Sequence, residues 1–212
     1  MIDFQIKICG ITNPTDALKA CEFGADAIGL NFYAKSLRSV TTAAAKELVD
    51  QLPSDLTKVG VFVNEAANTV NEICTECRLD YAQLHGDESP DLIQDLSFKA
   101  IRAIRVSNYE TAKNEINDWI TKGITAVLLD AAAGRQYGGT GKQLDWEPIS
   151  DLQLDVPLIL AGGLNCDNVS RAISVAKPNA VDVASGIEKF PGSKDHGQMQ
   201  AFISSAIDGF SH

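Results

Sequence analysis

Residues 4–9 read Phe4-Gln5-Ile6-Lys7-Ile8-Cys9, and residues 125–130 read Thr125-Ala126-Val127-Leu128-Leu129-Asp130. Both runs are apolar and typical of β-strands, and each ends in one side chain that can transfer a proton. Similar runs, rich in valine and isoleucine, occur near residues 26–32, 58–63, 80–85, 99–106, 157–161 and 180–184. Because continuously apolar strands are typical of parallel sheets buried on both faces, the sequence predicts eight parallel strands.

Helical patterns separate most of these strands. They cover residues 14–23, 42–51, 65–78, 89–96, 109–122, 165–176 and 195–207, with a single turn near 146–151. This alternation predicts an α/β protein with a parallel sheet and right-handed crossovers. Eight strands favour a closed (β/α)8 TIM barrel, for which about 200 residues is the lower limit of length, over an open doubly wound sheet. No linker or change of composition divides the chain, so residues 1–212 are expected to form a single barrel domain.

The charge of the chain restricts its partners. Lysine and arginine number 18 against 28 aspartate and glutamate, which gives a formal net charge of −10. Such a surface repels nucleic acid and anionic membranes, since both are bound through lysine and arginine. The N-terminus has no basic stretch followed by an apolar run, and no segment approaches the ~20 apolar residues that span a bilayer. We therefore expect a cytoplasmic protein that binds neither nucleic acid nor membranes.

The cysteines form neither a disulfide framework nor a zinc site. They are an odd and scattered set of five, namely Cys9, Cys21, Cys74, Cys77 and Cys166. Cys74 and Cys77 form a C-x-x-C motif, but a second pair of ligands at matching spacing is missing. Both lie in the predicted helix 65–78, where we expect them on the surface. No metal is expected.

Glycine-rich segments follow the last two predicted strands. In a barrel of this kind the reacting groups lie at the carboxyl ends of the strands, and phosphate commonly binds to the loops after the seventh and eighth. Gly162 and Gly163 follow the seventh strand, and Ser185 and Gly186 follow the eighth. Residues 186–190 could add a short helix. Together the two loops predict a phosphate site.

Five motifs carry a resemblance to a known family. They are Lys7-Ile8-Cys9-Gly10-Ile11-Thr12, Gln83-Leu84-His85-Gly86-Asp87-Glu88, Gly138-Gly139-Thr140-Gly141, Leu160-Ala161-Gly162-Gly163-Leu164 and Val181-Asp182-Val183-Ala184-Ser185-Gly186-Ile187-Glu188. In this order, over essentially the whole chain, they resemble phosphoribosylanthranilate isomerase of tryptophan biosynthesis. The resemblance implies an Amadori rearrangement of N-(5-phosphoribosyl)anthranilate to 1-(2-carboxyphenylamino)-1-deoxyribulose 5-phosphate. It implies a small phosphorylated substrate and neither a metal nor an organic cofactor, while monomer and homodimer both stay open.

The resemblance also assigns roles to residues. It places the general base at Cys9, the general acid at Asp130, and the arginine that binds the substrate carboxylate at Arg38. The family usually has proline before this arginine, where the chain has Leu37. Loss of proline frees the backbone, so we expect a looser loop with the guanidinium still in place. Further candidates to line the pocket are His85, Gly139, Thr140 and Gly141.

The chemistry of the rearrangement fits these residue types. One group must protonate the oxygen of the furanose ring, and another must then remove a proton from the adjacent carbon. An aspartic acid ordinarily titrates near ~3.9, so Asp130 needs apolar surroundings or an anionic ligand nearby to stay protonated. Lys7 points the same way as Cys9 along its strand and would favour the thiolate. A buried Lys7 requires a partner, and we expect Asp182 on the adjoining eighth strand.

Two other side chains at strand ends could reach a ligand. His85 is the one histidine at such a position, and we expect it to shape the pocket or hydrogen-bond a loop rather than to react. Arg105 is expected to be solvated or ion-paired.

Three other functions fit parts of the pattern. An isomerase of histidine biosynthesis performs the same type of rearrangement, but it would have an acidic residue in place of Cys9 and a second phosphate loop in the first half. A phosphate-binding lyase or aldolase would need a Schiff-base lysine at a strand end, which the sequence lacks. A non-catalytic phosphate-binding barrel would not need both Cys9 and Asp130. The fold alone decides none of these alternatives.

Overall fold

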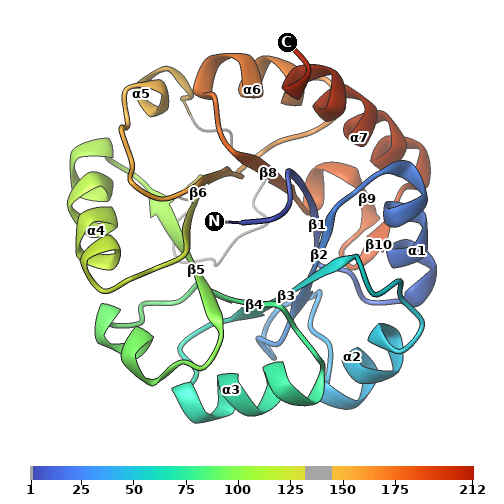
Figure 1. Cartoon of the computed structure of the whole chain (residues 1–212). Coiled ribbons are helices and arrows are strands. Elements are labelled where there is room, and N and C mark those ends of the chain that lie inside the picture. The colour runs from blue at the N-terminus through green and yellow to red at the C-terminus, as the bar shows by residue number, and fades with distance from the viewer. Residues whose placement is uncertain (1, 132–144) are drawn as a thin grey trace.

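The computed structural model describes residues 2–131 and 145–212. Within these residues eight parallel strands form a closed barrel, and the helices surround it (Figure 1). The strands are β1 (Ile6–Cys9), β2 (Ala27–Asn31), β3 (Thr57–Phe62), β4 (Tyr81–Leu84), β5 (Lys99–Val106), β6 (Ala126–Ala131), β7 (Leu158–Leu160) and β8 (Ala180–Val183). Because β1 pairs with both β2 and β8, the sheet closes on itself. The predicted barrel is confirmed, and the open doubly wound sheet is wrong.

Helices follow the strands where the sequence predicts them. They are α1 (Pro14–Phe23), α2 (Thr42–Val49), α3 (Ala67–Glu76), the 3-10 helix η1 (Pro90–Asp95), α4 (Tyr109–Thr121), α5 (Glu147–Ser150), α6 (Val169–Ala176) and α7 (His196–Phe210). α1 begins where the Asn13 side chain accepts a hydrogen bond from the backbone of Asp16, and it ends at Gly24 in left-handed backbone. None of the helices described is long and apolar enough to cross a membrane.

Two helices differ from the sequence-based prediction. The segment expected as a helix at 89–96 is the six-residue 3-10 helix η1. α6 begins four residues later than expected, because asparagine side chains hold the preceding turn. The backbone N–H of Asn165 donates to Asn168 Oδ1 at 2.8 Å, and that of Asp167 donates to Asn165 Oδ1 at 2.9 Å. Such local bonds compete with a helix.

Apolar side chains fill the barrel from its amino end. The inner cluster includes Phe4, Val59, Tyr81, Ile101, Leu128 and Ile159. Phe4 and Tyr81 meet edge to face with their ring centroids 5.9 Å apart, and both lie at the amino ends of their strands. A second, larger cluster lies between the strands and the helices. The carboxyl end of the barrel is thereby left for polar side chains.

Cys74 and Cys77 are buried, so their predicted place on the helix surface is wrong. Val70, Cys74 and Cys77 follow one another at helical spacing, and all three are fully buried in the outer cluster. The thiol of Cys77 contacts the carbonyl oxygen of Thr42 at 3.6 Å. The two cysteines act as small apolar side chains that pack α3 against the barrel.

A small hairpin follows β8, which the sequence analysis did not predict. The expected short helix at 186–190 is a single 3-10 turn, η2 (Ser185–Ile187), followed by the antiparallel strands β9 (Glu188–Phe190) and β10 (Ser193–Lys194). Gly192 has φ +84°, which lets the chain reverse between the two strands. Figure 1 shows the hairpin beside α1, and the hydroxyl of Thr12 donates to the carbonyl oxygen of Gly192 at 2.6 Å.

Candidate active site

Polar side chains at the carboxyl ends of the strands line one cavity. Its lining contains all of the predicted site residues that the structure describes, namely Cys9, Arg38, His85, Asp130, Gly162, Gly163, Ser185 and Gly186. The thiol and the carboxyl group thus lie at the same end of the barrel, on β1 and β6, which are three strands apart around it. Gly139, Thr140 and Gly141 lie outside the described residues. Arg105 is ion-paired with Asp87, as expected.

Lys7 lies beneath Cys9 and pairs with Asp182 across the seam between β1 and β8. The two residues are register partners, and Lys7 Nζ lies 2.8 Å from Asp182 Oδ1. The Lys7 side chain is fully buried, and 9% of the Asp182 side chain is exposed. This confirms the pair expected from the sequence. An ion pair at this depth fixes the end of β1, because neither charge has water to replace its partner.

Gly29 on β2 makes room for this arrangement. A Cβ atom there would lie 2.7 Å from Cys9 Sγ and 3.1 Å from Lys7 Nζ. Any side chain at position 29 would therefore displace the thiol or the ammonium. Sequence analysis missed this residue, although a glycine inside a strand is a known sign that another group approaches closely.

Burial controls the protonation of Cys9. It raises the pKa of the thiol above its ordinary value, and the negative charge of Asp182 adds to the rise. Lys7 and Lys194 act in the opposite direction but do not offset burial. The expectation that Lys7 favours the thiolate is correct in sign, but the buried thiol is still mainly protonated near neutrality. For Lys7 burial acts in the opposite sense and lowers the pKa, but Asp182 and Cys9 together raise the pKa above its ordinary value.

Asp130 faces His85 on the other side of the cavity. His85 Nε2 lies 3.5 Å from Asp130 Oδ2, and both side chains are about nine-tenths buried. His85 Nδ1 lies 3.4 Å from the amide nitrogen of Gln83. Among the described residues, neither His85 Nε2 nor Gln83 Oε1 has a hydrogen-bond partner. His85 therefore shapes the pocket next to the carboxyl group predicted to act as the acid.

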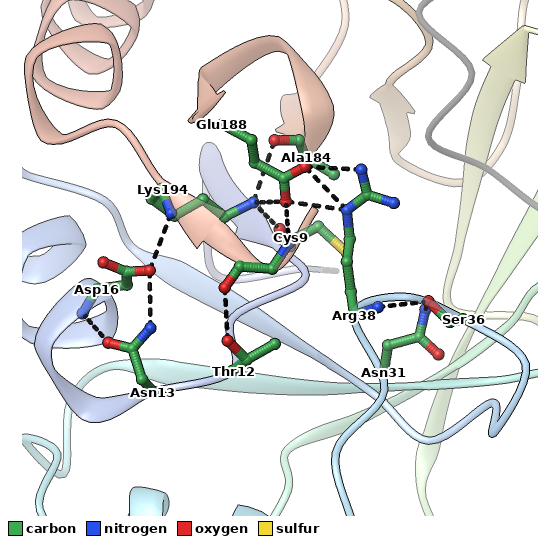
Figure 2. A network of polar contacts seen from close by, with 11 residues as sticks. Cys9, Thr12, Asn13, Asp16, Asn31, Ser36, Arg38, Ala184, Glu188 and Lys194 are labelled. Carbon is green, nitrogen blue, oxygen red and sulfur yellow. Dashed lines mark hydrogen bonds and ion pairs between the residues drawn. The ribbon is translucent and has the colours of Figure 1, made fainter. Parts of the chain in front are cut away.

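Arg38 is bound to a glutamate that sequence analysis missed. Arg38 Nε lies 2.9 Å from Glu188 Oε1, and Arg38 Nη2 lies 2.6 Å from Glu188 Oε2. Figure 2 shows this pair beside the thiol of Cys9, with Lys194 on the other side of Glu188. In the motif Ser185-Gly186-Ile187-Glu188, only Ser185 and Gly186 were predicted to belong to the site. Its acidic residue, which follows the phosphate loop directly, was the available signal.

The loop that carries Arg38 is held by polar bonds. Ser36 Oγ accepts hydrogen bonds from the backbone of Arg38 at 3.1 Å and from the Asn31 amide at 3.2 Å. Leu37 points to solvent with 78% of its surface exposed, so it contributes little to holding the loop. The looser loop expected from Leu37 stays a prediction.

The two glycine loops lie against each other. A Cβ atom at Gly186 would lie 1.9 Å from the carbonyl oxygen of Leu164, so the loop after β8 approaches the loop after β7 more closely than any other residue would permit. Gly162 and Gly163 both have positive φ, at 82° and 69°. Successive backbone N–H groups in such turns can converge on an anion. The loops thus form one continuous wall that fits a phosphate group.

The described residues offer no cluster that would hold a metal ion. Within 2–131 and 145–212, no group of three histidine, cysteine, aspartate or glutamate side chains has metal-binding geometry. The cavity residues named above include groups for acid–base chemistry, Cys9 and Asp130, and a cation that can bind an anion, Arg38. The absence of a cofactor stays a prediction.

A family model and the sequences of known proteins both relate this chain to one enzyme family. A family model for N-(5'-phosphoribosyl)anthranilate (PRA) isomerase matches residues 6–205. N-(5'-phosphoribosyl)anthranilate isomerase of Acidithiobacillus ferrooxidans is 43% identical over 199 residues, covering 94% of this chain and 95% of that protein. The enzyme of that name from Magnetococcus marinus is 45% identical over 199 residues, covering 94% and 93%.

Solved structures agree with the sequence comparison. Phosphoribosyl anthranilate isomerase from Thermotoga maritima superposes with a TM-score of 0.86 at 38% identity, covering 97% of this chain and 100% of that one. A phosphoribosyl anthranilate isomerase in complex with reduced 1-(o-carboxyphenylamino)-1-deoxyribulose 5-phosphate superposes with a TM-score of 0.83 at 37% identity and the same coverage.

Proposed function

Because the chain belongs to the N-(5'-phosphoribosyl)anthranilate isomerase family, and is thus an isomerase of tryptophan biosynthesis, we propose that Cys9 is its general base and Asp130 its general acid. Its membership of this family also decides against the histidine-biosynthesis isomerase and the non-catalytic barrel. The observation that supports the two roles is that the Cys9 thiol and the Asp130 carboxyl group line the same cavity from two strands that are three positions apart around the barrel.

The roles follow from the order of proton transfers. Asp130 donates a proton to the furanose ring oxygen as the bond from that oxygen to the anomeric carbon breaks, which leaves an open-chain imine protonated at nitrogen. Cys9 then removes the proton on the adjacent carbon, and the electron pair of that C–H bond neutralises the imine to an enolamine. Tautomerisation of the enolamine gives the aminoketose. The base and the acid must therefore reach atoms on different sides of one pentose.

Two groups of residues in the cavity bind different parts of the substrate. The loops with Gly162, Gly163, Ser185 and Gly186 bind the phosphate group, and Arg38 binds the carboxylate of the anthranilate ring. An overall charge of −10 opposes an anionic substrate, so affinity depends on these local sites.

The fluorescence of the anthranilate group provides the test. With wild-type protein the fluorescence of the substrate is expected to fall steadily as the substrate is converted. In Cys9→Ala and Asp130→Asn the turnover rate should fall at least a hundredfold, which is the lower end of the range for removal of a general acid or base. Both variants should keep the wild-type circular dichroism spectrum. Cys21→Ala and Asp118→Asn, whose changes lie on α1 and α4, are matched controls that should retain turnover. Undiminished turnover in both site variants would exclude the assigned roles.

Arg38→Ala tests the carboxylate site separately. Arg38→Ala should weaken substrate binding and so raise the Michaelis constant while the protein stays folded, because Glu188 keeps its second partner, Lys194. An unchanged Michaelis constant would show that the carboxylate binds elsewhere.

The assembly and location of the protein are part of the same proposal. Among the related structures are monomers generated from the dimeric enzyme of Thermotoga maritima, so both states occur with this fold. We propose that this chain acts in the cytoplasm as a single-domain monomer or homodimer. Sedimentation analysis of the purified protein would distinguish the two states.

A further inference from the structure

Three charged side chains form a row beside the cavity: Lys194, Glu188 and Arg38 (Figure 2). Glu188 Oε1 accepts hydrogen bonds from Lys194 Nζ at 3.0 Å and from Arg38 Nε at 2.9 Å. The exposed fractions of the three side chains are 0%, 4% and 15%, in the same order. The row carries a net charge of +1 in a chain whose net charge is −10. Neither Lys194 nor Glu188 has a role in the mechanism so far.

Lys194 ties this row to the strand that carries the base. Its ammonium group donates to the carbonyl oxygens of Cys9 at 2.6 Å and Ala184 at 3.1 Å, in addition to Glu188. Three donors thus meet three acceptors, which is the full capacity of the group. Burial lowers the pKa of Lys194, and Glu188 offsets only part of this effect. The ammonium therefore depends on Glu188 for the charge that compensates its burial.

Glu188 binds one edge of the Arg38 guanidinium, and within residues 2–131 and 145–212 no hydrogen bond is made by Arg38 Nη1. It accepts from Nε and Nη2, which form the side edge of the planar group. Nη1 points away from Glu188 in Figure 2. The stem of Arg38 also packs over Gly10, next to Cys9. The plane of the guanidinium is thus fixed, and its end edge, formed by Nη1 and Nη2, can still bind a carboxylate through two hydrogen bonds.

We propose that Glu188, held by Lys194, is a positioning residue that orients Arg38 so that its end edge meets the substrate carboxylate. The inference rests on the proposed function, since it takes Arg38 as the group that binds this carboxylate. An arginine side chain that is free to change rotamer loses entropy when it is held in one orientation by a ligand. Glu188 removes most of that loss before the substrate arrives, and this is the general benefit of preorganisation.

Glu188→Gln is the variant that tests the proposal, because it keeps the length of the side chain and removes its charge. The probes are N-(5-phosphoribosyl)anthranilate and the matching phosphoribosylamine built on aniline, which lacks the carboxylate. Product formation is followed by chromatography for both. With the first substrate the Michaelis constant should rise roughly tenfold and kcat should change less, as expected when one charge-assisted bond is lost. With the second substrate Glu188→Gln should equal wild type.

A double-mutant cycle with Arg38→Ala gives an independent result. In the Arg38→Ala background, Glu188→Gln should leave the Michaelis constant unchanged, since the group that it orients is gone. Additive effects, an equal loss with both substrates, or a lower Michaelis constant would each overturn the proposal. The last result would mean that Glu188 competes with the substrate carboxylate.

Two further measurements separate this proposal from its premise. Absence of turnover in wild type, or an Arg38→Ala variant with an unchanged Michaelis constant, would contradict the proposed function itself. Glu115→Gln is the matched control, because Glu115 also pairs with an arginine, Arg102 at 2.9 Å, outside the cavity lining. It should leave both substrates unaffected.

Lys194→Met serves as the second variant. It should raise the Michaelis constant only for the substrate with the carboxylate, and it should move the acidic limb of the kcat/KM profile to higher pH, since one cation beside Cys9 is removed. If Lys194→Met does not fold, the cycle with Arg38→Ala still decides the question.

Discussion

The two sides of the barrel mouth are built differently. On the side of β8, β1 and β2, the charged groups in and beside the lining are paired: Lys7 with Asp182, and Lys194 and Arg38 with Glu188. On the side of β4 and β6, His85 Nε2 has only a 3.5 Å contact to Asp130 Oδ2, and Gln83 Oε1 has no hydrogen-bond partner among the described residues. We call these the base side and the acid side, after Cys9 and Asp130. The base side is held by its own bonds, whereas the acid side keeps hydrogen-bonding capacity for a ligand.

This difference has an energetic meaning. A buried pair loses several kcal/mol when one partner is removed, because the remaining charge is left without water. A buried polar atom that lacks a partner already carries that kind of cost in the folded protein. Substitutions should therefore reduce stability on the base side far more than on the acid side. Four measurements test this expected difference in stability between the two sides.

Lys7→Met should have the largest effect. It leaves the Asp182 carboxylate nearly buried and unpaired, so the free energy of unfolding should fall by about 3–5 kcal/mol in urea titrations. Adding Asp182→Leu should restore most of the loss, because an apolar pair needs no charge compensation. A single variant as stable as wild type would show that the base side is not held by this pair.

Gly29→Ala should come second. The nearest atoms to the new Cβ include Cys9 Cα, which belongs to the backbone and cannot move aside. Overpacking of this kind costs about 1–3 kcal/mol, and kcat should fall as the thiol is displaced.

Gly60→Ala is a control for Gly29→Ala. Its Cβ would lie 2.6 Å from Leu79 Cδ1, on the side of the helices, so stability should fall while kcat is retained in the folded protein. Equal losses of kcat in the two variants would contradict a specific role for Gly29.

Gln83→Leu examines the acid side and should change stability little. Gln83→Leu loses only a 3.4 Å contact to His85 Nδ1 and an oxygen without a partner among the described residues, so the free energy of unfolding should change by about 1 kcal/mol or less. A loss of more than ~2 kcal/mol would mean that this side is as firmly bonded as the other. Urea unfolding measured beside Lys7→Met gives the direct comparison.

The smallest effect concerns the pH dependence of stability. Burial alone would raise the pKa of Glu188, but the hydrogen bonds from Arg38 and the charge of Lys194 hold it below its ordinary value. The folded state therefore binds this proton less readily than the unfolded state does. The stabilisation is complete above the ordinary range of a glutamate, near ~4.3, and is lost as the pH falls through the lowered pKa.

Comparison of wild type with Glu188→Gln measures this contribution. The difference between their free energies of unfolding should be largest near neutrality and should shrink as the pH falls below about 4. A difference that does not depend on pH would show that Glu188 stabilises the fold through its shape alone.

Periodicity made most of the fold predictable from the sequence. Alternating strands and helices determine a barrel, and closure of β8 on β1 then places Lys7 opposite Asp182. The residues around the cavity could be predicted because carboxyl ends of parallel strands meet at one rim. Each of these steps uses a regular repeat and a known direction of side chains.

Loops and local side-chain bonds account for what was missed. The Arg38–Glu188 pair joins the loop after β2 to the first residue of β9, 150 positions away in the sequence, and no repeat relates the two. The 188–194 hairpin replaced the expected helix because Gly192 reverses the chain. The C-x-x-C spacing of Cys74 and Cys77 predicted surface positions, but both residues continue the buried face of the helix that includes Val70.

The contact between Lys194 and Cys9 also affects when the folding chain becomes active. The bond from Lys194 to the Cys9 carbonyl spans 185 positions, and the Lys7–Asp182 bond spans 175. Contacts of such separation form late, since a long loop must close before they contribute any energy. A nascent or truncated chain that ends before residue 194 thus lacks the support for its own reactive thiol. After dilution from urea, turnover should accordingly recover more slowly than the helical circular dichroism signal. The recovery of turnover would then report the pairing of β8 with β1.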